Sequence, residues 1–176
     1  MNYLFLTNGF EEIEAVETID ILRRADVNLT TVSVEDTLEV KGAHNVVVKA
    51  DVLLNDIEIN DAETLILPGG TVRLFDFSKL TDLLVEHNKK GGLIAAICAA
   101  PSILGKLGIL EGKTATCYPG FEQYLTGAQV VDKRVVKSEN IITGKGPGCT
   151  KQFALEIVLT LCGQEKTNEV AEAMIA

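Results

Sequence analysis

The chain has 176 residues, a length that suits one domain, residues 1–176, with a full hydrophobic core. Apolar residues make up 47% and charged residues 23%, which are values of a globular protein and exclude a disordered chain. With 16 basic and 25 acidic residues the formal net charge is −9, which argues against nucleic-acid binding because that class of protein carries a basic face.

The chain offers no membrane segment and few metal-binding patterns. No apolar run approaches the roughly 20 residues that span a bilayer, and the first residues lack the basic start and cleavage site of a signal peptide. We therefore expect a cytoplasmic protein with no membrane contact. The four cysteines contain no C-x-x-C pair, so we expect no metal site, no cofactor and no disulfide: Cys98, Cys117, Cys149 and Cys162.

Strand-like and helix-like segments alternate along the chain. Short apolar or β-branched runs bounded by turn residues predict strands over 3–7, 29–34, 38–41, 46–49, 64–67, 93–97, 114–117 and 140–143. Apolar residues at helical spacing predict helices over 13–25, from an N-cap at Ser78, after Pro101, from Thr150, and over 166–176. The alternation predicts an α/β sandwich with a mostly parallel sheet, whose ligand site lies at the carboxyl ends of the strands.

Cys98 directly follows the most apolar of these strands and directly precedes a helix. A side chain at such a junction is lifted above the sheet edge, as in a nucleophile elbow. The helix start behind it favours the thiolate, the nucleophilic form of cysteine. The alternative is an inert buried cysteine, which is the usual fate of this residue.

Glu14 lies in the first turn of the first helix, so it also falls near the carboxyl edge of the sheet. Burial beside a thiolate would raise its pKa and let it donate a hydrogen bond or move a proton. The alternative is that Glu11, Glu12 and Glu14 are all solvated acids that suit the helix dipole.

Glycines after the 64–67 strand allow the backbone to approach a reacting group. The N–H groups of Gly70 and Ala99 are candidates for an oxyanion hole beside Cys98. Taken alone, the Pro68-Gly69-Gly70 sequence predicts only a turn. His87 is interpreted as structural because of its helical spacing, and Arg134 as a surface charge.

Four motifs together resemble the ThiJ/PfpI superfamily, in its parkinsonism-associated deglycase branch. They extend over most of the chain and keep the order and spacing of that family: Gly9-Phe10-Glu11-Glu12-Ile13-Glu14, Leu65-Ile66-Leu67-Pro68-Gly69-Gly70, Gly92-Leu93-Ile94-Ala95-Ala96-Ile97-Cys98-Ala99-Ala100-Pro101 and Gly146-Pro147-Gly148.

The resemblance implies a flavodoxin-like three-layer sandwich with a reactive, easily oxidised cysteine at Cys98. It implies that Glu14 is the protonated partner of this sulfur and that Gly70 and Ala99 are the backbone donors around it. It also implies a homodimer formed through the first helix and the hairpin, with Arg24 and His44 near the site at that interface.

Two positions depart from the pattern of the family. Several relatives carry a histidine where this chain has Tyr118, which is a poor base near neutral pH because its reference pKa is about 10. A Cys–His dyad is therefore absent, unless His44 substitutes from a partner subunit, and protease activity is not expected. Cys149 replaces a Thr or Ser of relatives and adds a second thiol that can be oxidised.

Two functions remain open from the sequence. The first is a cofactor-free glyoxalase or deglycase that acts on reactive dicarbonyls such as methylglyoxal, or on their adducts. The second is a redox-sensing or chaperone-like stress protein that works through the Cys98 sulfinate with little turnover. In either case we expect a small-molecule partner rather than nucleic acid or membrane.

Overall fold

The computed structural model describes residues 1–176 and is built on a seven-stranded sheet in the order β10-β11-β7-β6-β1-β2-β5. Neighbouring strands are parallel except β10 and β11, which pair antiparallel at one edge. This arrangement confirms the predicted α/β class. The strands are β1 (Asn2–Leu6), β2 (Leu29–Ser33), β5 (Val52–Leu53), β6 (Thr64–Leu67), β7 (Leu93–Ile97), β10 (Val135–Ser138) and β11 (Ile141–Gly144).

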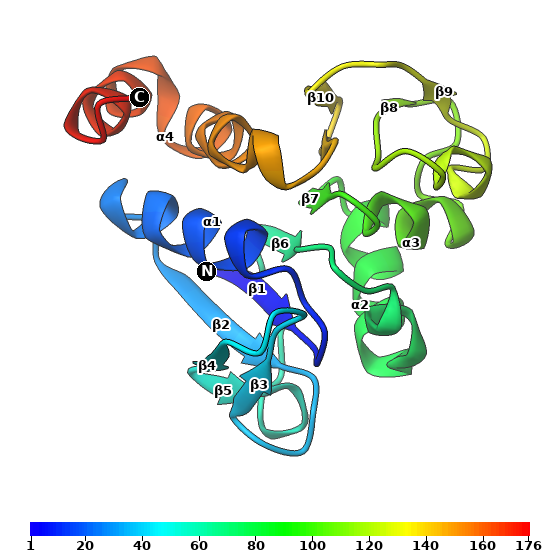
Figure 1. Ribbon diagram of the computed structural model, residues 1–176. Coiled ribbons are helices and arrows are strands. Elements are labelled where there is room, and N and C mark those ends of the chain that lie inside the picture. The colour runs from blue at the N-terminus through cyan, green and yellow to red at the C-terminus, as the bar shows by residue number, and fades with distance from the viewer.

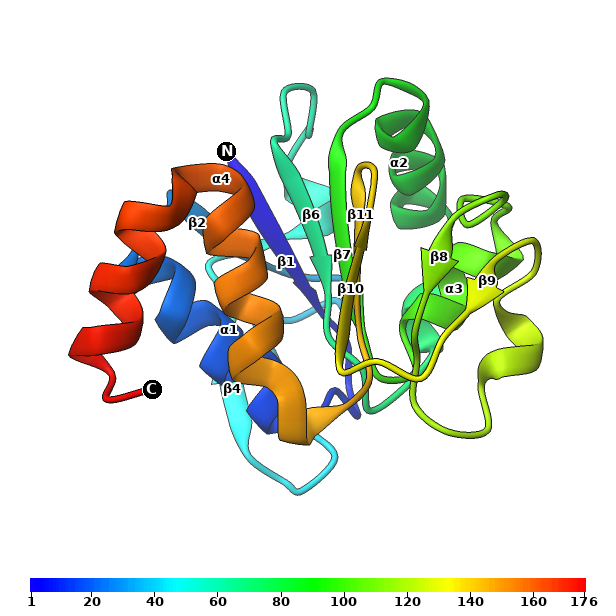
Figure 2. The ribbon, with the colours of Figure 1, turned by 90° about the horizontal axis from the view of Figure 1, so that it is seen from above.

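Helices cover both faces of this sheet (Figures 1 and 2). On one face lie α1 (Glu12–Arg24) and α4 (Thr150–Ala173), side by side. On the other lie α2 (Ser78–Lys89) and the short α3 (Pro101–Lys106). The molecule is therefore the three-layer sandwich expected from the sequence.

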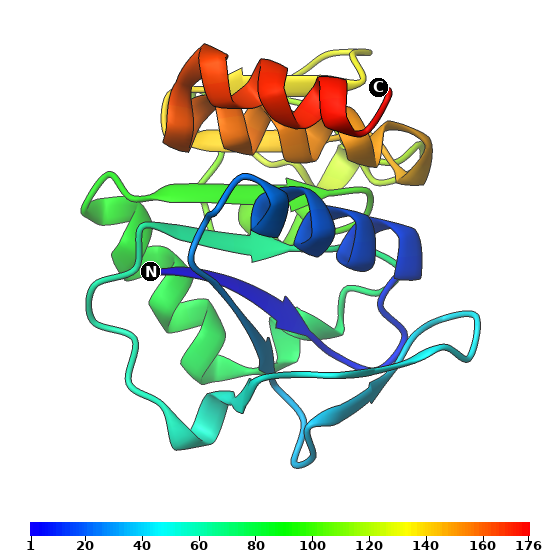
Figure 3. The same ribbon diagram turned by 90° about the vertical axis from the view of Figure 1, so that its left-hand side faces the viewer.

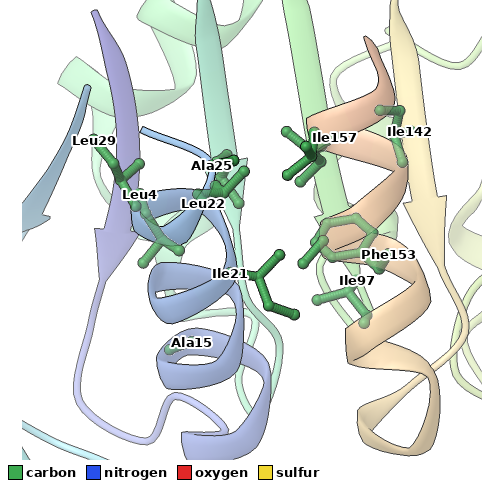
Figure 4. Close-up of a cluster of buried hydrophobic side chains, with 14 of the residues drawn as sticks. Leu4, Ala15, Ile21, Leu22, Ala25, Leu29, Ile97, Ile142, Phe153 and Ile157 are labelled. Carbon is green, nitrogen blue, oxygen red and sulfur yellow. The ribbon is translucent and has the colours of Figure 1, made fainter. Parts of the chain in front are cut away.

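Alternating side chains of the central strands supply the two halves of the core. In β7, Ala95 and Ile97 pack with α1 and α4, whereas Ile94 and Ala96 pack toward α2 and α3. Figure 4 shows part of the first half, where Phe153 of α4 lies against Ile97. Because both faces of β7 are covered, the strand is apolar throughout, which explains why it is so evident in the sequence.

A hairpin of β3 (Glu39–Lys41) and β4 (Val47–Lys49) confirms the predicted strand pair and lies beside the start of α1 (Figure 3). Two hydrogen bonds hold it to the loop after β1: Gly9 N donates to Lys41 O at 2.8 Å and Ala43 N donates to Phe10 O at 2.8 Å. Short 3-10 turns complete the chain over Leu54–Asp56, Arg73–Asp76, Glu122–Tyr124 and Pro147–Cys149.

Three local predictions need correction. The predicted strand 114–117 is only the two-residue β8 (Thr114–Ala115), which pairs with β9 (Gln129–Val130) outside the central sheet. Ser78 is not an N-cap but the first helical residue, since Phe77 precedes the helix and no side chain caps it. The predicted last helix continues from α4 after a break at Gly163, where φ is +83°. No helix is both long and apolar enough to cross a membrane.

Candidate active site

Three loops meet at the carboxyl ends of the central strands. The loop after β1 leads into α1 and carries Glu14, the loop after β6 carries Gly69 and Gly70, and β7 ends immediately before Cys98. Because β1, β6 and β7 are parallel neighbours, these loops share one edge of the sheet. The structure thus brings together the two residues that the sequence singled out, Cys98 and Glu14.

Cys98 occupies a strained elbow between β7 and α3. Its φ is +65°, a left-handed conformation that costs energy for a residue with a side chain. Two backbone hydrogen bonds hold the elbow: Cys98 N donates to Gly144 O at 2.9 Å, and Tyr118 N donates to Cys98 O at 2.8 Å. The residue is buried, with 8% of its surface exposed.

Glu14 is completely buried, which removes the alternative that it is a solvated acid. Its Oε2 atom accepts a hydrogen bond from Gly69 N at 2.7 Å. The Oε1 atom is buried and has no hydrogen-bond partner. The Cys98 side chain is its neighbour across Gly69 and is close enough to lower the pKa of Glu14.

Gly69 separates these two side chains and must be a glycine. A Cβ atom at this position would lie 2.6 Å from the Cys98 Cβ atom and 2.7 Å from the Glu14 Oε2 atom. Such contacts are far closer than van der Waals separation, so any side chain would push the pair apart. The sequence assigned a role to Gly70 but not to Gly69. The close approach of Gly69 to Cys98 and Glu14 exists only after three loops that are distant in sequence converge.

The pKa values of both side chains are raised, chiefly by burial. Desolvation raises the pKa of Glu14 to about 7, although the hydrogen bond from Gly69 lowers it. Burial, and then the charge of Glu14, raise the pKa of the Cys98 thiol to about 12. The pair therefore carries one negative charge above about pH 7, and its second proton is held because two buried charges would lie side by side.

This result corrects the expectation that the helix start makes Cys98 a thiolate. The backbone N–H groups of Gly70 and Ala99 do lower the pKa of the thiol, but burial has a larger effect. The helix behind Cys98 has only six residues, so its dipole is small. Gly70 itself has φ of +85°, and a Cβ there would lie 2.3 Å from Glu11 N.

The two other acids at the start of α1 have structural partners. Glu11 is the N-cap, and its Oε2 atom accepts from Glu14 N at 2.8 Å. Glu12 binds His44, whose Nδ1 atom lies 2.8 Å from the Glu12 Oε2 atom. The cap was missed in the sequence because glutamate is not among the residues that commonly cap the start of a helix.

Glu11, Glu12 and His44 each place one ligand atom within 4.8 Å of the others, which is a spacing compatible with a metal ion. The cap and the ion pair account for these contacts without a metal. The His44 side chain is 74% exposed, and its pKa is raised by the hydrogen bond to Glu12.

The remaining candidate residues lie farther out. Tyr118 is 46% exposed and reaches Cys98 through its backbone. Arg24 lies ten residues after Glu14 on α1, or about 15 Å along the helix, and pairs with Asp20. Within one chain it does not reach the site, so its predicted role depends on a second subunit. Cys149 is buried, and its thiol donates to Gly146 O at 3.0 Å.

Comparison with known proteins identifies the family. A sequence model described as the DJ-1/PfpI family matches residues 2–160. The chain belongs to the DJ-1/PfpI family. This match extends over the Glu14, Gly69 and Cys98 loops described above.

Relatives of similar length support this assignment. Protein dj-1beta of Drosophila melanogaster is 38% identical over 177 residues, which cover 98% of this chain and 95% of that protein. The glutathione-independent glyoxalase DJR-1.2 of Caenorhabditis elegans is 37% identical over 168 residues, covering 93% and 89%. The family therefore contains a protein named as a glyoxalase.

Solved structures of the family have the same fold. The crystal structure of Drosophila melanogaster DJ-1beta superposes with a TM-score of 0.95 at 37% sequence identity, covering 100% of this chain and 99% of that one. The structure of oxidized Toxoplasma gondii DJ-1 superposes with a TM-score of 0.94 at 36% identity, covering 98% and 96%. The predicted flavodoxin-like sandwich of this family is confirmed.

Proposed function

We propose that the protein is a cofactor-free, cysteine-dependent glyoxalase that converts 2-oxoaldehydes such as methylglyoxal to 2-hydroxy acids, with activity on their adducts as a deglycase. The observation that carries this proposal is the contact between the Cys98 thiol and a Glu14 carboxyl whose pKa is about 7. A group with a pKa near the working pH is suited to move protons in both directions.

The reaction begins with addition to the aldehyde. The Glu14 carboxylate accepts the proton of the Cys98 thiol as the sulfur bonds to the aldehyde carbon, and the carbonyl π bond breaks to leave an oxyanion. The N–H groups of Gly70 and Ala99, which act on the sulfur in the free protein, stabilise this oxygen. Protonation by Glu14 gives a hemithioacetal.

Rearrangement then moves a proton between neighbouring carbons. Glu14 removes the hydrogen of the former aldehyde carbon as a proton, which gives an enediol, and returns a proton to the former ketone carbon. The first carbon is oxidised to a thioester while the second is reduced to an alcohol, so no external electron acceptor is needed. Water hydrolyses the thioester to release the 2-hydroxy acid and restore the thiol.

The direct test measures lactate formed from methylglyoxal without glutathione. Wild type is expected to produce lactate, and Cys98→Ser is expected to lose at least a hundredfold in kcat/KM because the nucleophile is removed. The exposed Cys162 provides the control, since Cys162→Ser leaves the site intact. Unchanged turnover in Cys98→Ser overturns the proposal.

A second candidate is redox sensing through the Cys98 sulfinate. The same two N–H donors and a protonated Glu14 would bind the sulfinate oxygens, and one relative is described as an oxidized DJ-1. The raised pKa of the thiol does not distinguish the enzyme from the sensor, because the thiolate is the form that attacks both an aldehyde and peroxide. Peptide mass analysis after mild peroxide separates the two, since a sensor gains two oxygens on Cys98 at low dose.

A homodimer formed through α1 and the hairpin is part of the proposal. Ile13, Val16, Val46 and Val47 are 44–55% exposed, and three of them line one groove with Met174. Apolar exposure of this kind marks a protein interface. A second copy is also the means by which Arg24 and His44 would approach the site. The free thiols fit the proposed cytoplasmic location.

A further inference from the structure

A cavity of about 340 Å³ is lined by Tyr118, the residue whose backbone is hydrogen-bonded to Cys98, although Cys98 itself is not part of the lining. The cavity has no role in the chemistry above. Its lining comes from two segments, one after β8 and one after β11, together with one residue before β10: Tyr118, Pro119, Arg134, Lys145, Gly146, Pro147, Gly148 and Cys149. The cavity borders the backbone of the Cys98 elbow, because Tyr118 N donates to Cys98 O at 2.8 Å. The Tyr118 ring in turn lies against Gly146, where a Cβ would be 3.1 Å from the Cδ2 atom.

The charge of this cavity is unusual for the molecule. The chain has a net charge of −9, and each of the other four main cavities contains at least two carboxylates in its lining. The cavity beside Cys98 contains none, and its charged residues are Arg134 and Lys145. An acidic protein thus presents a cationic recess one backbone hydrogen bond away from its candidate nucleophile.

Arg134 is positioned without being neutralised. Its Nε atom donates to the Gln152 Oε1 atom at 2.6 Å and its Nη2 atom donates to Gly148 O, and both acceptors are neutral. Its Nη1 atom forms no hydrogen bond within the chain. Lys145 pairs with Asp132, whose side chain is 87% exposed, and an ion pair this exposed is exchanged at little cost.

Apart from its charge, the cavity has mainly apolar walls, which favour a ligand with a carbon chain. The Tyr118 ring, Pro119, Pro147 and the aliphatic stems of the two basic side chains present mainly carbon. A ligand that fits therefore combines a short carbon chain with a terminal anion.

We propose that this cavity is the subsite for the non-reacting end of the substrate, and that it selects 2-oxoaldehydes whose chain ends in a carboxylate or a phosphate. The proposal rests on the proposed function for the reacting end. The aldehyde lies at Cys98, the chain extends past the Tyr118 ring, and the anion binds the free Nη1 group of Arg134, with Lys145 adding to the positive potential.

Matched substrates test the selection. We compare kcat/KM for 2-oxopentanal, which is neutral, and 4,5-dioxopentanoate, which has the same number of carbons and a carboxylate; 3-phosphooxy-2-oxopropanal represents the phosphate class. Wild type is expected to prefer one or both anions, and Arg134→Gln to lose about fivefold of that preference while retaining turnover of the neutral substrate. Lys133→Gln removes an equal charge from an exposed neighbour outside the cavity and should retain the preference.

A second measurement separates this proposal from the proposed function. Alkylation of Cys98 by iodoacetamide is followed by peptide mass analysis in the presence of butyramide, butyrate or propyl phosphate. An anion that binds the subsite protects Cys98 at a lower concentration than butyramide does, and Arg134→Gln removes the difference. If no 2-oxoaldehyde is turned over but protection by an anion depends on Arg134, the glyoxalase fails and the anion subsite stands. Equal protection by all three compounds, or equal behaviour of Arg134→Gln and Lys133→Gln, overturns the subsite.

Discussion

Glu14 and Cys98 meet across the α-carbon of Gly69, and a single added methyl group would collide with both of them. One side chain comes from the first helix and the other from the end of β7, which are 84 positions apart in the chain. Their contact places a carboxyl of pKa about 7 against a buried thiol. The first two predictions depend on this contact.

Replacing Glu14 by Gln keeps the shape of the side chain and removes its proton transfer. Turnover of methylglyoxal is expected to fall by roughly 10² to 10⁴. In wild type, kcat/KM should rise as pH increases through about 7, because the carboxylate is the base. This rise should be absent from the pH–rate profile of Glu14→Gln. If the variant keeps the rise, a group other than Glu14 is responsible for it.

Glu14→Gln should also change how stability depends on pH. In wild type, stability should fall as pH rises, whereas activity should increase. The folded pKa of Glu14 is raised from 4.5 to about 7, so its contribution to stability is present below pH 4.5 and is lost as pH rises through 7. The loss amounts to about 3 kcal/mol by pH 8. Urea unfolding at pH 5 and pH 8 should show a smaller change in Glu14→Gln than in wild type, and an equal change would contradict the raised pKa.

Replacing Gly69 by Ala should damage the site and destabilise the fold. The new Cβ would also lie 2.9 Å from Ile97 O, so relief requires a backbone shift that costs about 1–3 kcal/mol. Both Tm and the rate of turnover should fall. Gly148→Ala is the matched control for Tm because a Cβ there meets nothing within 4 Å. If the two variants unfold at the same temperature, the close approach at Gly69 is not a constraint.

A charge on the exposed face of α1 should prevent dimer formation. Ile13 is 53% exposed, and Ile13→Asp would bury an unpaired carboxylate in the proposed interface. Sedimentation is expected to show a monomer for this variant and a dimer for wild type and for Val130→Asp, which alters an exposed valine of β9. A wild-type monomer at micromolar concentration would exclude the interface.

His87 is predicted to limit stability in mild acid. Burial lowers its pKa, although a hydrogen bond between Nε2 and Leu93 O at 3.1 Å acts against this effect. The neutral form is favoured in the folded state, so stability is present above the unfolded pKa of about 6.5 and is lost as pH falls below it. His87→Gln should lose less stability than wild type between pH 7.5 and pH 5.5 in urea titrations. Parallel curves would show that His87 does not titrate in this range.

The sequence by itself determined the layers of the fold and the position of the candidate nucleophile. β6 and β7 are buried on both faces, so their apolar runs are continuous and their ends are sharp. Cys98 follows from the same pattern, because a strand that ends directly before a helix leaves one residue at the elbow. By contrast β5 and β9 have only two residues each, and a run of that length carries no periodicity.

Only the tertiary structure decided the chemistry of the site. The pKa values of Glu14 and Cys98 depend on desolvation, and desolvation depends on which loops close over them. The need for glycine at position 69 and the cap at Glu11 likewise arise from contacts between segments that are distant in sequence or from backbone geometry. Arg134 appeared to be an ordinary surface charge until the fold placed it beside the cavity next to Cys98. The local hydrophobic pattern of the sequence determines which residues end a strand. The burial of those residues and their distances from other segments are determined only when the strands are assembled into a sheet.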